Sequence, residues 1–69
     1  MSLTNLQSDV LVYLTDHPGA FVQEIRIDVA TSTHRVNAAL NTLWGHGLVE
    51  RNGPRWWVYV GEGVLNGLD

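Results

Sequence analysis

Apolar residues recur at helical spacing near the start of the chain. They share one face of a helix that begins after Thr4: Leu6, Val10, Tyr13 and Leu14. Thr4 and Gln7 have the spacing of a capping box, in which each side chain bonds the backbone N–H of the other residue. The sequence Asp16-His17-Pro18-Gly19 then ends the helix, because proline cannot continue it and glycine permits a turn.

Two further helices are predicted over residues 23–30 and 33–44. Ile25 and Val29 lie four apart in the first helix. Apolar residues repeat at i, i+4 and i+7 in the second: Val36, Leu40 and Leu43. Ser32 is a suitable N-cap for the second helix, and Gly45 and Gly47 supply the left-handed backbone that ends one. These three apolar residues of the second helix are therefore expected in the core.

The pattern changes to that of strands after residue 47. Residues 48–51 and 55–60 read as two strands around Asn52-Gly53-Pro54, since Asn-Gly is a strong hairpin signal in which both residues tolerate positive φ. Residues 20–22 are expected to be extended and to pair with this hairpin. Because the second strand is apolar throughout, we expect one of Trp56 and Trp57 in the core and the other on the outer face.

The register E-I-x-x-x-V-x-x-S-x-x-x-V-x-x-x-L-x-x-L-x-x-x-G-L-V-x-R occupies residues 24–51 without insertion or deletion. It resembles the winged helix-turn-helix domains of small bacterial and archaeal regulators, and the MarR-like and phage-repressor-like groups look most similar. The resemblance implies an α+β fold with a single winged helix-turn-helix domain over residues 1–69. Its core would span about residues 4–60, followed by a tail. Such domains usually bind double-stranded DNA, but some serve only as protein-docking modules.

Length and charge narrow the class of protein. The chain has 69 residues and no cysteine, so it makes one small domain without disulfides or thiolate metal sites. No apolar run approaches a membrane span and no signal-like segment opens the chain, so a cytoplasmic protein is the default. The net charge of −3 argues against a nucleic-acid partner, but residues 31–59 carry three arginines against one glutamate.

The helix expected over residues 33–44 presents an outer face that suits base readout. Arginine, asparagine and a small alanine are side chains used in the major groove, and this face holds no carboxylate. With the tip of the wing, the candidate DNA contacts are Ser32, Thr33, His34, Arg35, Asn37, Ala38, Asn41, Arg51, Asn52 and Arg55. The alternative is an ordinary solvated helix face, with wing arginines that keep an edge ribbon soluble. The lack of Glu and Lys on the helix face favours nucleic acid.

A second resemblance concerns winged helices that bind left-handed Z-DNA. It is carried by Val36-Asn37-Ala38-Ala39-Leu40 and Gly53-Pro54-Arg55-Trp56-Trp57, where Asn37 and a wing tryptophan match that family's pattern. The family's recognition-helix tyrosine corresponds to Asn41, and its lysines correspond to Thr33 and His34. Because shape readout of that kind depends on the missing aromatic and cations, the sequence favours the other reading.

The function expected from the sequence is therefore sequence-specific binding of double-stranded DNA by a small transcription regulator, acting as a repressor. The alternative is a winged-helix protein-interaction module that does not bind DNA. The three histidines lack metal-ligand spacing, and no residue pair is placed for catalysis, so no metal, cofactor, small molecule or enzymatic activity is expected.

Few cations also predict a homodimer. Three arginines give a log-log salt slope of only about −3, too shallow for tight binding by a monomer. The apolar material for a dimer would come from Leu11 or Val12 in the first helix and from the tail, as Val64, Leu65 and Leu68. The alternative is that Leu11 contacts the hairpin or tail, Val12 is a lone exposed residue, and the tail forms an apolar turn on the first helix.

Overall fold

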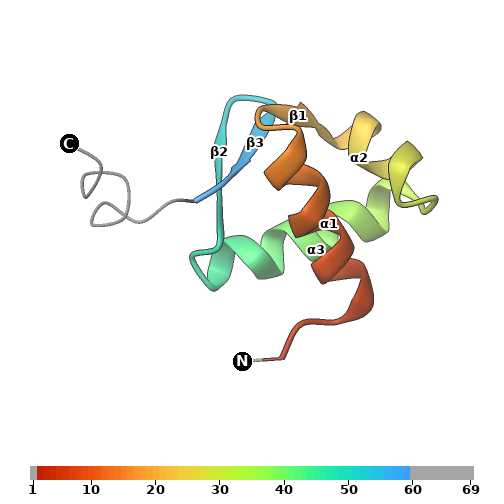
Figure 1. Cartoon of the computed structure of the whole chain (residues 1–69), viewed down its shortest axis with the longest axis horizontal. Coiled ribbons are helices and arrows are strands. Elements are labelled where there is room, and N and C mark those ends of the chain that lie inside the picture. The colour runs from red at the N-terminus through yellow and green to blue at the C-terminus, as the bar shows by residue number, and fades with distance from the viewer. Residues whose placement is uncertain (1, 60–69) are drawn as a thin grey trace.

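The computed structural model describes residues 2–59, which form three helices and a three-stranded antiparallel sheet (Figure 1). The elements are α1 (Asn5–Asp16), β1 (Ala20–Phe21), α2 (Val22–Asp28), α3 (Thr33–Gly45), β2 (Val49–Asn52) and β3 (Arg55–Val58). This order confirms the predicted α+β winged helix-turn-helix, with β2 and β3 as the wing. The predictions for the tail fall on residues 60–69, outside the described residues.

The capping box at the start of α1 is confirmed. The Gln7 N–H donates to the Thr4 hydroxyl and the Thr4 N–H donates to the Gln7 side-chain carbonyl, both at 3.1 Å. Val10 and Leu14 point into the core from this helix. At its far end Gly19 has φ +80°, and a Cβ there would lie 3.2 Å from Trp57 Cζ2. The backbone angle therefore favours glycine, and a Cβ would also press against the indole.

The α2 helix differs from its predicted bounds at both ends. It begins at Val22, where the Glu24 carboxylate accepts a hydrogen bond of 2.7 Å from the Phe21 N–H. It ends at Asp28, because Ala30 adopts a left-handed φ of +54°. The N–H groups of Ala30 and Thr31 donate to the carbonyls of Ile27 and Arg26 respectively, which is the hydrogen-bond pattern of a Schellman motif. The expected continuation of this helix to residue 30 is wrong.

The sheet has the order β1-β3-β2, so β3 is its central strand. Trp56 pairs with Ala20 on one side and with Arg51 on the other. At the hairpin turn Gly53 has φ +63°, whereas Asn52 is the last residue of β2, so only one of the two turn residues takes positive φ. Trp56 is buried and Trp57 is half-buried beside Gly19, as expected for one tryptophan in the core.

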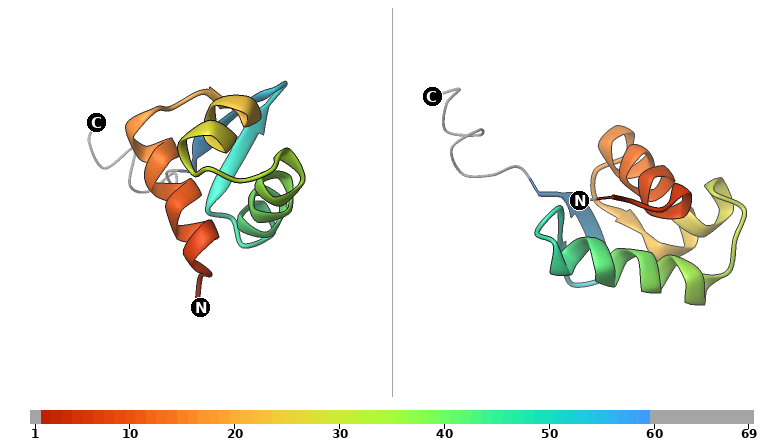
Figure 2. Two further views of the ribbon diagram at one scale, coloured as in Figure 1. Left: turned by 90° about the vertical axis from the view of Figure 1, so that its right-hand side faces the viewer. Right: turned by 90° about the horizontal axis from the view of Figure 1, so that it is seen from below.

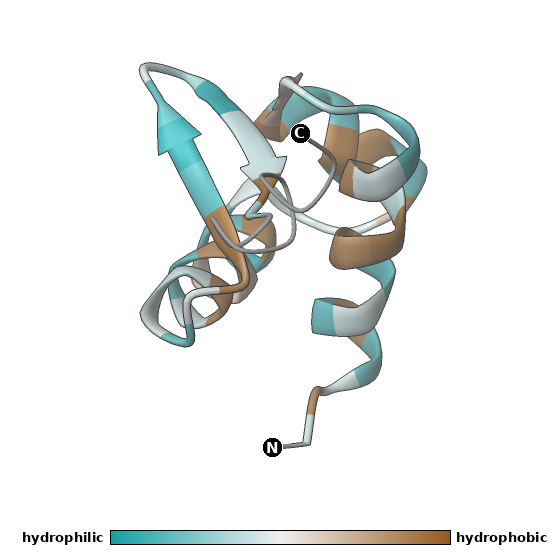
Figure 3. Cartoon of the chain, turned by 60° about the vertical axis from the view of Figure 1, so that its left-hand side comes forward, coloured by the Kyte–Doolittle hydropathy of each residue, from teal (hydrophilic) through white to brown (hydrophobic). Residues whose placement is uncertain are grey.

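The core lies where α1, α2 and α3 meet the hairpin (Figure 2). The three residues predicted for the core from α3 are among its largest fully buried side chains. These side chains are Leu14, Ile25, Leu40, Leu43, Val10, Val36 and Val49. In Figure 3 apolar residues, in brown, recur along the helices and at the start of β2. Leu11 is half-buried against the core, whereas Val12 is 59% exposed. No helix within residues 2–59 is long and apolar enough to cross a membrane.

Candidate nucleic-acid interface

The N-terminus of α3 is fixed by two side-chain hydrogen bonds. The Ser32 hydroxyl accepts from the Arg35 N–H at 3.2 Å, which confirms Ser32 as the N-cap. The Thr33 hydroxyl accepts from the Gln23 side chain of α2 at 3.3 Å. The second bond links the start of α3 to α2, and the first is local to α3, so the two predicted contacts at 32 and 33 already have partners within the fold. Both hydroxyls still have a proton to donate.

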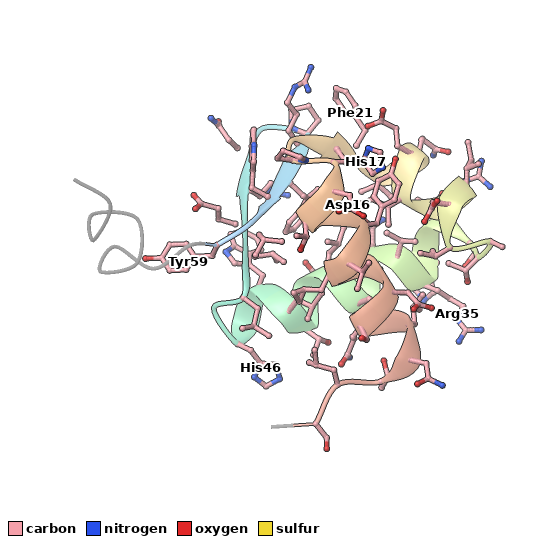
Figure 4. All side chains as sticks on the ribbon, viewed as in Figure 1. Asp16, His17, Phe21, Arg35, His46 and Tyr59 are labelled. Carbon is pink, nitrogen blue, oxygen red and sulfur yellow. The ribbon has the colours of Figure 1, made fainter. Side chains whose placement is uncertain are left out.

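Apart from half-buried Thr33, the predicted contacts on α3 are exposed, but they divide between two sides of the helix. His34, Arg35 and Ala38 line an open pocket of about 270 Å³ with Thr4 and Gln7 from the first turn of α1. We call this the α1 side. Figure 4 shows the Arg35 side chain near the start of α1 and far from Tyr59, which follows β3. The guanidinium predicted to read bases therefore lies away from the wing.

Asn37 lies on the other side, facing the hairpin. It lines an open groove of about 310 Å³ with residues from the wing and from the β1–α2 connection: Arg51, Gly53, Pro54, Trp56, Phe21, Val22 and Gln23. We call this the α3–wing groove. Asn37 and one of the two wing tryptophans, Trp56, are thus brought together from separate segments of the sequence. Asn41 is exposed on the outer face of α3 between the two sides, as its place on the helix requires.

The two wing arginines differ in their surroundings. Arg51 Cζ lies 5.1 Å from the ring centroid of Trp44 and 5.7 Å from that of Trp56. Arg55 instead lies over Phe21, at 4.5 Å, and its Nη1 donates to the Gly19 carbonyl at 3.0 Å. Arg55 therefore ties the wing to β1, and Arg51 is the arginine that borders the groove. Asn52 is exposed at the end of β2.

Trp44 belongs with these residues, although the sequence reasoning did not select it. Its ring packs against that of Trp56 at 5.6 Å between centroids and 88° between planes, and the residue is 45% exposed. The signal was its position seven residues after Asn37, which places both on one stripe of α3. A tryptophan at this position could equally be a core residue packed on the tryptophan-rich strand. The sequence pattern alone therefore did not distinguish a core residue from one that lies beside the groove.

Four of the five acidic residues within residues 2–59 lie in α1 and α2, and the fifth, Glu50, lies in β2. Asp9, Asp16 and Asp28 line a pocket of about 300 Å³ with Tyr13 and His17, whose rings stack at 4.3 Å between centroids. Figure 4 shows Asp16 and His17 together near the end of α1. Desolvation by burial raises the pKa of the Tyr13 phenol, and the carboxylates of Glu24 and Asp28 raise it further. Negative charge is thus concentrated away from the α3–wing groove.

Metal chemistry has no site in the part of the chain that the structure describes. Within residues 2–59 no three His, Cys, Asp or Glu side chains come close enough together to hold a metal ion. The stacking of His17 on Tyr13 accounts for one of the three histidines, and His34 and His46 are exposed on α3 and just beyond it. The groups that the α3–wing groove offers for binding are an amide, a guanidinium and aromatic rings.

Comparison with known proteins supports the fold. No protein-family model matches the sequence, and no curated protein matches it. Among solved structures, the chain is similar to a Zalpha domain from Cyprinid Herpesvirus3, in a structure concerned with the binding mode of that domain to Z-DNA. The two are 23% identical, with a TM-score of 0.75, over 78% of this chain and 92% of that one. The similarity shows the winged-helix fold; the MarR-like and phage-repressor-like resemblance gains no support from it.

Proposed function

We propose that this chain binds double-stranded DNA through the α3–wing groove, and that left-handed Z-DNA is the form it prefers. The observation that carries the proposal is that Asn37 and Trp56 line one groove, together with Pro54 and Arg51. These residues come from a helix and a hairpin that are adjacent only in the folded chain. The solved Zalpha domain with the same fold is described as binding Z-DNA, and this supports choosing that form first.

The groove contains the groups that recognise a nucleic-acid backbone. The Asn37 amide can donate to a phosphate oxygen or accept from water, and Arg51 supplies a positive charge beside it. Exposed Pro54 gives apolar surface for sugar rings, and the buried ring of Trp56 closes the groove beneath. Such contacts fix the path of the backbone and carry no base sequence, so they distinguish duplexes by shape.

The departures from the Z-DNA-binding pattern affect affinity. Asn41 stands where that pattern has tyrosine, and Thr33 and His34 stand where it has lysines. Each missing lysine removes one phosphate neutralisation, and with it about one unit of salt slope. We therefore expect weak binding that is most readily measured at low salt.

Sequence-specific binding of right-handed DNA by a transcription regulator is the second candidate. The exposure of Arg35, Asn37 and Asn41 along the outer face of α3 favours it, because these side chains can reach base edges. Repression would follow if such a site overlapped a promoter. The acidic surface of α1 and α2 favours instead the third candidate, a module that binds a protein.

One titration separates these functions. An alternating CG duplex that is held in the left-handed form by base modification is compared at low salt with the unmodified duplex, which is right-handed, and with a random-sequence pool. Preference for the left-handed duplex, and its loss in Asn37→Ala but not in Thr42→Ala on the α1 side, supports the proposal. Preference for one sequence selected from the pool favours the regulator, and no binding to any duplex favours a protein partner.

Homodimerisation would raise the affinity of so weakly charged a protein. Val12 offers the described part of such an interface, at 59% exposure on α1. We propose that two copies bind neighbouring sites, which doubles the number of arginines per complex. Sedimentation at micromolar concentration with and without DNA tests this. A monomer under both conditions would contradict it.

A further inference from the structure

Two indole rings and a guanidinium pack together next to the α3–wing groove. They belong to Trp44 from α3, Trp56 from β3 and Arg51 from β2. We call them the aromatic corner, because the two indole planes meet at 88° and the Arg51 guanidinium lies over both rings. Arg51 and Trp56 also line the groove. The corner is therefore a continuation of the groove along α3, toward the C-terminus of that helix.

The two tryptophans play different parts in the corner. Trp56 is only 4% exposed and belongs to the core, whereas Trp44 is 45% exposed. Trp56 and Arg51 hold Trp44 in place while leaving much of its surface in water. A guanidinium that packs on a ring uses its face, so the N–H groups in the plane of Arg51 remain available to an anion. The corner thus offers an aromatic surface and a cation side by side.

This pair of groups fits one nucleotide. An aromatic surface stacks on a base, and the adjacent cation binds its phosphate. Bases inside an intact duplex are covered by their neighbours on both faces, so Trp44 cannot stack on them. A base with a free face is needed, as an unpaired nucleotide provides.

The spacing between Trp44 and Asn37 indicates how far the stacked nucleotide would lie from the duplex contact at Asn37. The two residues are seven positions apart on α3, or about 10 Å at 1.5 Å per residue. For a duplex axis that runs along α3, this equals about three nucleotide steps at an axial rise of about 3.4 Å per step. A duplex held at Asn37 with its end toward the C-terminus of α3 would therefore present its next nucleotides to Trp44.

We propose that the aromatic corner binds an unpaired nucleotide adjoining the duplex, so that the preferred ligand of this protein is a duplex with a single-stranded extension. The proposal rests on duplex binding by the α3–wing groove. It assigns Trp44 to base stacking and Arg51 to the phosphate, and it makes Trp44 a residue that determines the choice between duplex ligands.

The experiment uses one hairpin whose alternating CG stem is held in the left-handed form, because that is the proposed duplex ligand. Three forms of it are compared at fixed low salt: a blunt end, a three-nucleotide thymine extension, and an abasic extension of the same length. The abasic form adds the phosphates without the bases. Wild-type protein should bind the thymine form at least about fivefold more tightly than the abasic form, which corresponds to stacking of one base at ~1 kcal/mol. The variants are Trp44→Leu, which keeps apolar cover on Trp56, and Trp44→Phe, which keeps a ring. Ile27→Ala, at a 68% exposed apolar residue of α2, is the matched control.

The preference should disappear in Trp44→Leu and persist in Trp44→Phe and Ile27→Ala, with circular dichroism melting used to check that each variant folds. Equal binding of the thymine and abasic forms by wild type overturns the inference and leaves the proposed function standing. So does a preference that survives in Trp44→Leu. If Trp44→Leu does not fold, the test rests on Trp44→Phe, which keeps a ring. Loss of the thymine preference in folded Trp44→Phe would then overturn the inference. Failure to bind any of the three hairpins overturns both proposals together.

Discussion

The two sides of α3 have similar polar residues but different support. On the α1 side, His34, Arg35 and Ala38 face only the first turn of α1. On the wing side, Asn37 faces a groove built from the hairpin and the β1–α2 connection, and Trp44 packs on a core tryptophan. One side is thus a helix surface with a shallow pocket, and the other is the meeting point of several elements.

This difference indicates where a binding site can be rigid. A long side chain such as Arg35 retains its rotamer freedom until it binds, and binding then has to order it. Arg51 is already placed by two rings, at 5.1 and 5.7 Å, so less freedom is lost on contact with a phosphate. Composition along the helix does not reveal this, because it comes from residues of the hairpin.

The largest effect is expected when the common support of the wing side is removed. Trp56→Ala should lower the free energy of unfolding by about 3–5 kcal/mol, because it empties a buried site under Trp44 and Arg51. Chemical denaturation measures this loss. The matched substitution is Trp57→Ala, at a half-buried ring, which should cost clearly less. Equal losses in the two variants would mean that the core does not depend on Trp56 in particular.

The next effect concerns DNA binding by the two sides of α3. Asn37→Ala should weaken binding to the preferred duplex by about 1–3 kcal/mol, whereas Arg35→Ala should change it by less than about 0.5 kcal/mol at moderate salt. Fluorescence anisotropy with a labelled duplex measures both. A loss in Arg35→Ala as large as that in Asn37→Ala would show that the α1 side also reads DNA, as the regulator hypothesis requires.

A smaller effect should separate the two wing arginines. Arg51→Ala should reduce the magnitude of the log-log salt slope by about 1, because a phosphate contact is lost. Arg55→Ala should leave the slope nearly unchanged and instead lower stability, since its guanidinium bonds Gly19 and covers Phe21. Affinity measured between 20 and 200 mM salt (about one decade) tests the slope. A reduced slope in Arg55→Ala together with an unchanged slope in Arg51→Ala would instead indicate that Arg55 contacts the DNA.

The smallest effect is expected from the cap that supports the α1 side. Thr4→Ala removes the hydroxyl that accepts from the Gln7 N–H and should cost about 1 kcal/mol of stability. Binding to the duplex at 10 °C, where the variant stays folded, should not change. Thr4→Ser, which keeps the hydroxyl, is the control. Weaker DNA binding by Thr4→Ala alone would connect the pocket beside α1 to recognition.

Most of the fold could be predicted from local sequence patterns. Both N-caps, the buried stripe of α3 and the position of the hairpin follow from spacing and turn residues, and all are confirmed. The end of α2 was missed because its left-handed residue is Ala30, where glycine usually marks such a cap. Alanine at that φ is strained, and the neighbouring hydrogen bonds hold it there.

The candidate site was predictable only in part. The residues of α3 were correctly placed on its surface, since helix periodicity fixes which side chains point outward. Their partners were not, because a groove between α3 and the wing depends on how the hairpin packs. The positions of Trp44 under Arg51, and of Arg55 on Phe21, are tertiary contacts without a sequence signal. Whether the predicted residues contact DNA stays a prediction.

The central place of β3 in the sheet has a consequence for the order in which the chain folds. The contact of Arg55 with Gly19 closes a span of 36 positions, whereas the helix-turn-helix closes much shorter ones. Longer loops cost more entropy to close, so the helices should associate before β3 inserts between β1 and β2. On a ribosome, Trp56 is the last core residue of the described chain to be made. Until it emerges, β1 has no strand to pair with, and α3 has no complete wing beside it.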